Sequence, residues 1–269
     1  MLNRRFSNIT DFGNFIKLDM LCTYHCEVGE EWHFDNHCHS YNRLYVVLDG
    51  NGYLYNEKEH VDLEPYNIYL IPANSSYNYR CDKYMQKLFI HFKLFIIPGT
   101  DILSSIEKII KISVPKEEAE RLKNICYCDN VTSALFFQSY ILKIAASALE
   151  PYSDKITREL KIYKKYESLF KYVEDNTYAD TSVAEVCRHV GFSQTYISHK
   201  FKDDTGRSIK KLMTDMLLDK IKLMLQFESK TIKEIAEELR FNNEFYLSRF
   251  FKKHMGISPR EYKKRHGAL

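Results

Sequence analysis

The chain has 269 residues, of which 45% are hydrophobic and 14% aromatic, so it carries enough apolar surface for two folded domains and is not intrinsically disordered. Its seven cysteines are an odd number at irregular spacing, which excludes a simple disulfide framework and favours a reducing compartment. The apolar runs are too short to span a bilayer and the first residues lack a signal-peptide core. We therefore expect a cytoplasmic protein with no membrane partner.

Residues 1–95 are predicted to be rich in β-strands. Short runs of aromatic and β-branched residues alternate with turn sequences such as Asp-Gly-Asn-Gly at 49–52. Many short strands at regular spacing predict a sandwich or a small barrel. The clearest strand candidates are residues 43–48, 52–55, 67–71 and 87–92.

The tripeptide 37–39 has a histidine at each end, Arg43 follows after three intervening residues, and Gly50 follows after six more. This spacing resembles the first cupin motif, H-x-H-x3-E-x6-G, with arginine in place of the glutamate. The second cupin motif is only partly preserved, with Tyr77 where its histidine would fall. Because two metal ligands of the cupin pattern are replaced, we expect neither a metal nor a cofactor.

Arg43 shares strand parity with the two histidines, so these side chains are predicted to point into the barrel. A buried guanidinium needs a hydrogen-bonding or anionic partner. That partner is either an internal carboxylate such as Glu27, Glu30 or Asp35, or a small-molecule effector; a plain core or surface role for the histidines is the alternative. The predicted effector-pocket residues are His37, His39, Tyr41, Arg43, Tyr45 and Tyr77.

Helical periodicity begins after residue 100. Short amphipathic runs are predicted at 102–110 and 117–127, followed by a long, largely apolar helix at 131–149. The long helix has more apolar surface than one domain face needs, which favours a homodimer; simple packing against the barrel is the alternative. Residues 151–154 are interpreted as the interdomain joint, and a further helix is predicted at 163–174.

The last third of the chain contains an internal repeat. Ser182 with Glu185, and Thr231 with Glu234, form two capping boxes, each followed by a short helix, a turn and a second helix. The repeat offset is 49 residues for the first helices and 50 for the second, so one residue is inserted in the later turn. Two such pairs, joined by a helix at 209–227, predict two helix-turn-helix units.

This region resembles the AraC-type transcription regulators, whose later unit ends in a pattern like F-x-K-x-x-G-x-S-P-x-x-Y, found here at residues 251–262. Arg240 replaces the usual glycine of the family, and a positive φ there would cost about 1 kcal/mol. The resemblance implies a two-domain α+β protein: a cupin-like β-barrel followed by helices, then an all-α domain. The predicted division is 1–98 for sensing, 99–154 for dimerisation and linker, and 155–269 for DNA binding, with units at about 182–206 and 231–256.

Charge is distributed unevenly, because residues 182–269 contain 18 Lys+Arg against 11 Asp+Glu while the whole chain has a net charge of only +3. A basic C-terminal region is the electrostatic signature of a phosphate-binding module. The outward positions of each second helix are predicted to contact bases, and nearby lysines to contact the DNA backbone. The predicted base contacts are Gln194, Thr195, Ser198, His199, Glu244, Phe245, Ser248 and Arg249. The predicted backbone contacts are Lys200, Lys202, Lys210, Lys211, Lys252 and Lys253.

Taken together, these features predict a regulator that binds double-stranded DNA and senses a small molecule such as a sugar or an organic acid. RNA polymerase is a further candidate partner. One alternative keeps the DNA-binding region but places the N-terminal domain under the control of a protein partner. Another is a metal-dependent cupin enzyme with a DNA-binding tail, although the sequence shows neither a metal-ligand set nor a catalytic constellation.

Overall fold

The structure, a computed structural model, describes residue 13 and residues 16–97 and 100–266. The chain divides into two compact units, with the boundary between Ile156 and Thr157. Each unit has its own hydrophobic core. The two-domain α+β class is therefore confirmed, whereas the finer division at residues 98 and 154 remains a prediction.

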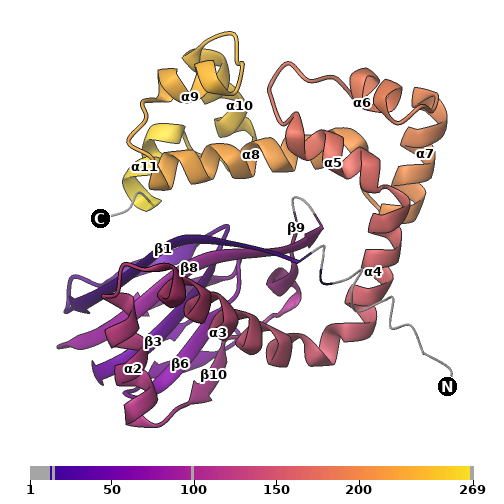
Figure 1. Ribbon diagram of the computed structural model, residues 1–269. Helices are drawn as coiled ribbons and strands as arrows, with labels where there is room; N and C mark the ends of the chain where they lie inside the picture. The colour runs from indigo at the N-terminus through magenta and orange to yellow at the C-terminus, as the bar shows by residue number, and fades with distance from the viewer. Residues whose placement is uncertain (1–12, 14–15, 98–99, 267–269) are drawn as a thin grey trace, which may run out of the picture. The chain divides into compact units, whose positions relative to one another are not determined.

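The N-terminal unit is built from two antiparallel sheets (Figure 1). The larger has the strand order β1-β8-β3-β6-β10, with β9 paired to β8, and the smaller has the order β2-β7-β4-β5. The strands therefore form two separate sheets rather than one closed barrel. The larger sheet contains β1 (Lys17–Val28), β3 (Asn42–Gly50), β6 (Asn67–Ile71), β8 (Met85–Ile97), β9 (Thr100–Asp101) and β10 (Ile110–Ser113); the smaller contains β2 (Phe34–Cys38), β4 (Gly52–Tyr55), β5 (His60–Leu63) and β7 (Ser76–Arg80).

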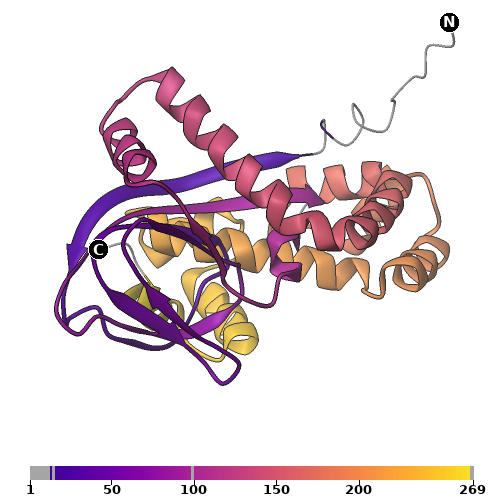
Figure 2. The same ribbon diagram turned by 90° about the horizontal axis from the view of Figure 1, so that it is seen from below.

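Strand β3 lies inside the larger sheet, between β6 and β8, and every residue from 42 to 48 is buried. An antiparallel strand with both faces buried must be covered on both sides. On one side, Tyr45 and Val47 join a core cluster with Trp32, Leu54 and Tyr79, which come from the smaller sheet and its connections. On the other side, α2 (Lys116–Cys126) and α3 (Val131–Leu149) run along the sheet in both views (Figures 1 and 2).

The helical run expected at 102–110 is only partly correct. Asp101 caps a short 3-10 helix, η1 (Ile102–Ser105), by accepting a 2.9 Å hydrogen bond from the Leu103 N–H. Residues 110–113 instead pair with β6 as β10. The alternation Ile-Lys-Ile-Ser in these residues has the period of a strand. The preceding isoleucines have helical spacing, which led to the prediction of a helix through residue 110.

The residues interpreted as the interdomain joint, 151–154, are helical. Pro151 lies in the first turn of a 3-10 helix, η2 (Glu150–Tyr152), where its missing N–H costs nothing, and α4 (Ser153–Lys165) follows directly. The resulting run Val131–Lys165 is, by length and composition, the one helix among the described residues that could cross a membrane; its apolar window has a mean hydropathy of 1.2 and is 28% buried.

In its described residues from 157 onward, the C-terminal unit contains helices joined by loops and turns, with no strand. The predicted helix 163–174 is interrupted at Tyr166, whose φ of −116° and ψ of 21° are not helical. The Tyr166 ring lies 5.2 Å from the Phe201 ring and its hydroxyl donates to Asp204, so tertiary packing breaks the helix. The remaining helices are α5 (Glu167–Asp175), α6 (Val183–His189), α7 (Gln194–Thr205), α8 (Ile209–Phe227), α9 (Ile232–Glu238), α10 (Glu244–Met255) and α11 (Pro259–His266).

Candidate nucleic-acid interface and effector site

Both predicted capping boxes are present. The hydroxyl of Ser182 accepts from the Glu185 N–H at 3.2 Å, while the Ser182 N–H donates to the Glu185 carboxylate at 2.7 Å. Thr231 and Glu234 make the same two bonds at 3.2 and 2.7 Å. These bonds satisfy N–H groups that would otherwise lack partners at the starts of α6 and α9. The repeat seen in the sequence is therefore a repeat of the structure.

The turn in each unit uses a left-handed residue. Gly191 has φ 75° in the first unit and Arg240 has φ 55° in the second, so the condition under which Arg240 would carry strain is met. The Arg240 guanidinium lies 3.8 Å from the centre of the Tyr178 ring. The strained backbone of this residue is accompanied by a cation–π contact that glycine could not make.

Helices α7 and α10 are the second helices of the two units. Their N-caps are Ser193 and Asn243, and both helices end at a left-handed glycine, Gly206 (φ 72°) or Gly256 (φ 77°). Residues at equivalent positions are buried against the unit's core, namely Ile197 and Phe201 in α7 and Leu247 and Phe251 in α10.

From the helical period of the two second helices we would expect Tyr196 and Tyr246 to point inward with their buried neighbours, and this expectation is wrong. Tyr196 is 55% exposed and Tyr246 is 47% exposed. Each packs at the surface against a turn residue, Phe192 or Phe241, with ring centres 5.7 and 6.1 Å apart. A tyrosine can leave its hydroxyl in water while its ring covers apolar surface, and the helical period alone did not distinguish this from full burial.

The predicted base-contacting residues all lie at the surface of α7 and α10. Phe245 is the most exposed of the large apolar residues among them, at 70%. An exposed phenylalanine at the start of a helix has no role in the core and remains free for a partner. The exposed members are Gln194, Thr195, His199, Phe245 and Arg249, and the partly exposed members are Ser198, Glu244 and Ser248.

The six predicted backbone-contacting lysines are all exposed, but they differ in their partners. Lys200 lies 3.5 Å from Asp204 and Lys211 lies 2.8 Å from Asp215. Surface pairs of this kind contribute little and exchange readily with other anions. In the described chain no carboxylate pairs with the other four, which are Lys202, Lys210, Lys252 and Lys253.

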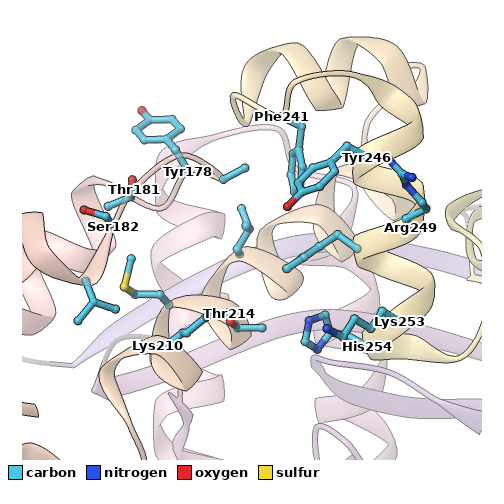
Figure 3. Close-up of a pocket in the computed structure, with 15 residues that line it drawn as sticks. Tyr178, Thr181, Ser182, Lys210, Thr214, Phe241, Tyr246, Arg249, Lys253 and His254 are labelled. Carbon is cyan, nitrogen blue, oxygen red and sulfur yellow. The ribbon is translucent and has the colours of Figure 1, made fainter.

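A hollow of about 780 Å³ lies within the C-terminal unit, between the two helix-turn-helix units (Figure 3). One wall is residues 178–183, the floor is the first half of α8, and the opposite wall is α10 with Phe241. The hollow brings Lys210 of α8 together with Arg249 and Lys253 of α10, although the two helices are separate in the sequence. Fifteen residues line it: Tyr178, Ala179, Thr181, Ser182, Val183, Lys210, Met213, Thr214, Leu217, Phe241, Tyr246, Arg249, Phe250, Lys253 and His254.

In the N-terminal unit, Arg43 is fully buried on β3. Its Nη2 donates to the Ser75 carbonyl at 3.3 Å and to the Ser75 hydroxyl at 3.4 Å. Its Nε and Nη1 have no hydrogen-bond partner among the described residues. Its guanidinium lies 5.7 Å from the Tyr79 ring, whose hydroxyl is also buried without a partner in the described chain.

The internal carboxylates considered from the sequence do not neutralise Arg43. Asp35 pairs with Arg80 instead. Glu27 is exposed and accepts from Gln86 at 3.0 Å, and Glu30 is exposed. The guanidinium is thus a buried cation whose hydrogen-bonding capacity is partly unused.

Lys87 is a second buried cation that the sequence analysis missed. Its Nζ lies 3.7 Å from the centre of the Trp32 ring and 4.1 Å from the Tyr45 ring. Burial lowers the pKa of Lys87 to about 7, and the Arg43 charge adds to that effect. Burial and the same two cations also lower the pKa of His91 well below its usual value. The alternation of side chains along β8 could have revealed this position, because it places Lys87 and His91 on one face of the strand.

The other predicted pocket residues are distributed over two groups. The rings of His37, His39 and Tyr41 follow one another at 4.3 and 4.7 Å, and Tyr41 continues to His91 at 4.7 Å. Tyr45 lies in the core beside Lys87, and Tyr77 donates its hydroxyl to Glu59. In the portion of the chain that the structure describes, no group of three or more His, Cys, Asp or Glu side chains could hold a metal ion.

Two helix-turn-helix units joined by one helix, together with a sheet domain that buries uncompensated cations, define a DNA-binding protein with a ligand-binding domain. Comparison with known families agrees: residues 24–108 match the AraC-like ligand binding domain and residues 180–265 match a helix-turn-helix domain. The chain belongs to the AraC-type transcription regulators.

Individual relatives extend this similarity. The HTH-type transcriptional activator Btr of Bacillus subtilis (strain 168) is 26% identical over 218 residues, covering 77% of this chain and 41% of Btr. The activator RhaR of Pectobacterium carotovorum subsp. carotovorum (strain PC1) is 23% identical, covering 86% of this chain and 87% of RhaR. The ToxT structure from Vibrio cholerae shares the fold, with a TM-score of 0.51 at 14% identity over 93% of this chain and 100% of ToxT. The chain spans 40–55% of the length of the first curated relatives that it matches.

Proposed function

We propose that the protein is a sequence-specific regulator of transcription that binds double-stranded DNA with α7 and α10 in the major groove. The observation that carries this proposal is the repeated unit: the same caps and the same buried positions leave the predicted base-contacting side chains of both helices exposed or partly exposed. An exposed second helix in each unit is the element that enters a major groove in helix-turn-helix proteins.

The side chains on these helices suit particular base edges. Arg249 is suited to bidentate contact with guanine, and Glu244 to accepting from the amino group of cytosine. Phe245 and Thr195 offer apolar contact to a thymine methyl group. The lysines carry no sequence information and set the position of the duplex through its phosphates.

This proposal is tested by selecting duplexes from a random-sequence library with the purified full-length protein. We expect the selected DNA to share two short half-sites whose centres are about 10 base pairs apart, because two linked recognition helices meet successive major grooves on one face. A selected pool with no shared sequence would overturn the proposal.

The N-terminal unit is proposed to sense a small anionic effector, which favours an organic acid over a neutral sugar. Support comes from Arg43, with two unused donors, and from Lys87, which faces aromatic rings rather than a carboxylate. A carboxylate can accept two parallel bonds from a guanidinium, and neighbouring rings supply apolar walls. Binding of such an anion would compensate buried positive charge that the fold leaves uncompensated.

The test is a thermal-shift screen of organic acids and neutral sugars on the full-length protein and its Arg43→Met variant. We expect an acid to raise the melting temperature of the wild type, and the variant to keep its melting temperature but lose that shift. Arg80→Met, which removes an arginine already paired with Asp35, is the matched control. A loss of stability in Arg43→Met without ligand would show that the arginine serves the fold, and the absence of any shift would favour control by a protein partner.

We also propose that the protein acts in the cytoplasm as a homodimer and that RNA polymerase is a partner, with no enzymatic role. The support for dimerisation is α3, which has two apolar faces. One face is buried in the N-terminal unit, and the other is exposed at Val131 (76%), Leu135 (60%) and Leu142 (37%). These three residues fall within one stripe at 3.6 residues per turn. A second copy of the chain would cover that stripe.

A further inference from the structure

The hollow in the C-terminal unit lies between elements of both helix-turn-helix units. Residues 178–183 lead into α6 of the first unit, and α10 is the second helix of the second unit. In Figure 3, Lys210 and Thr214 lie on the floor formed by α8, and Arg249, Lys253 and His254 lie along α10. A molecule held here would contact both DNA-binding units at once.

The two walls are joined directly, in addition to their connection through α8. The Ala179 N–H donates to the Leu239 carbonyl at 2.9 Å, and Ala179 packs against the core cluster of the second unit. The Arg240 guanidinium stacks on Tyr178 at 3.8 Å. These contacts fix the width of the hollow, because the segment 178–183 and the turn at 240 hold each other in place.

The charge of the lining is of one sign. Lys210, Arg249 and Lys253 are exposed cations, and none of the fifteen lining residues is an aspartate or glutamate. In the described chain none of the three forms an ion pair, whereas Lys200 and Lys211 elsewhere on the surface do. Exposed cations without internal partners, on opposite sides of a recess, provide strong attraction for a polyanion.

The remaining lining suits a sugar–phosphate chain better than an isolated inorganic anion. Thr214 offers a hydroxyl, and tyrosine and threonine hydroxyls are common donors to phosphate oxygens. The rings of Tyr178, Tyr246 and Phe250 provide apolar surface against which deoxyribose can pack. A phosphate alone would make no use of those rings.

We infer that this hollow seats the DNA sugar–phosphate backbone that runs between the two half-sites. The inference rests on the proposed binding of α7 and α10 in successive major grooves, because the backbone between those grooves must then pass the surface that joins the two units. Lys210 and Lys253 contact its phosphates from the floor and from one wall. Arg249 lies at the edge of the hollow, within reach of the adjoining groove.

A consequence is that the spacer between half-sites contributes to binding although no side chain reads its bases. Its phosphates provide affinity. The base sequence of the spacer affects affinity indirectly, because it determines how easily the duplex bends or narrows its groove to fit the hollow. Spacer phosphates are therefore the atoms to perturb.

The experiment uses the full-length protein and a duplex selected from random DNA. Individual spacer phosphates are replaced by uncharged methylphosphonates, and binding is measured for the wild type and for Lys210→Gln, Lys253→Gln and the control Lys171→Gln. Lys171 is an exposed lysine of α5 that does not line the hollow. We expect that neutralising one or two spacer phosphates weakens wild-type binding by about 3- to 10-fold. Lys210→Gln and Lys253→Gln should each reduce the slope of log affinity against log salt concentration by about 1.

The decisive result is the coupling between the two changes. Lys210→Gln and Lys253→Gln should lose little further affinity when the spacer phosphate is neutral, because the contact is already absent, whereas Lys171→Gln should lose as much as the wild type. If the wild type tolerates every neutral spacer phosphate while still requiring both half-sites, the hollow does not seat the backbone, although the proposed function stands. If selection yields no specific duplex, the proposed function fails and this inference fails with it.

Discussion

Arg240 combines a backbone cost with a side-chain gain. A non-glycine residue at φ 55° carries strain of about 1 kcal/mol, and a cation over a ring at an exposed site contributes about 0.5–1 kcal/mol. The two terms are of similar size. An arginine is therefore tolerated at this left-handed position, and it adds a contact to Tyr178 that joins the two DNA-binding units.

Arg240→Ala is expected to lower the free energy of unfolding of the C-terminal unit by about 0.5–1 kcal/mol, because it removes the cation and keeps the strained β-carbon. Arg240→Gly should recover most of that loss by relieving the strain. Urea unfolding followed by far-UV circular dichroism measures both. Tyr178→Leu is the control background, in which Arg240→Ala should cost less; equal stability of the Ala and Gly variants would contradict this account.

Lys87 gives the N-terminal unit a defined pH dependence. The folded protein holds the pKa of Lys87 at about 7, whereas an unfolded lysine titrates near about 10.4. Between these values the unfolded state binds more protons at this lysine, so the contribution of Lys87 to stability is lowest below pH 7 and rises as pH increases. Burial also raises the pKa of the Cys26 thiol, which has the opposite effect above about pH 8.5. The window that reports Lys87 is therefore pH 7 to 8.5.

Over that window the unfolding free energy of the N-terminal unit should rise by about 1.5 kcal/mol, and Lys87→Met should be more stable at pH 7 and lack the rise. Trp32 is the single tryptophan of the chain and lies against Lys87, so its fluorescence follows this unit alone. Lys83→Met, which changes an exposed lysine, is the control. A wild type whose stability is flat between pH 7 and 8.5 would show that Lys87 keeps an ordinary pKa.

At the scale of elements, the exposed stripe of α3 predicts an oligomeric state. Leu135→Glu places a charge in the centre of the proposed dimer contact, so it should convert the dimer to a monomer in sedimentation velocity without lowering stability. Ser147→Glu adds the same charge on another exposed face of α3 and should leave the dimer intact. Dimers that persist in Leu135→Glu would place the interface elsewhere.

Helix α10 separates two kinds of DNA contact. Arg249→Ala should cost about 1–3 kcal/mol on the selected duplex and relax the preference at one base position, because a bidentate base contact is lost. Lys253→Ala should weaken binding to all sequences alike and flatten the salt dependence. Equal effects of Arg249→Ala on selected and random duplexes would remove its assignment to a base.

The sequence predicted those elements in which local signals agree with packing. The helical repeat of apolar residues predicted α3 correctly, and the capping boxes and turn glycines predicted the paired helices correctly. Prediction from the sequence failed where tertiary contacts determine the secondary structure. Tyr166 ends α4 within the predicted helix. Residues 110–113 form a strand because they pair with the edge of β6. Lys87 was missed because a lysine in a strand is ordinarily exposed, and only the fold reveals that both sheets and Trp32 enclose it.

At the scale of the whole molecule, the two helix-turn-helix units form one compact body. Helix α8 has 19 residues and so spans about 28 Å, and the contacts of Ala179 with Leu239 and of Tyr178 with Arg240 add a second connection. A body held at two places cannot readily rotate one recognition helix relative to the other. The spacing of half-sites on DNA should therefore be strict.

Inserting five base pairs between the half-sites turns one of them by about half a helical turn, to the opposite face of the duplex. We expect affinity to fall to that of a duplex with one half-site destroyed, both for the full chain and for residues 155–269 alone. Ten inserted base pairs restore the face but separate the half-sites by about 34 Å more, which α8 cannot bridge, so binding should not recover. Fluorescence anisotropy with the four duplexes measures this. Indifference to the five-base-pair insertion would mean that α7 and α10 do not read one duplex together, because a rigid pair of recognition helices can satisfy only one spacing.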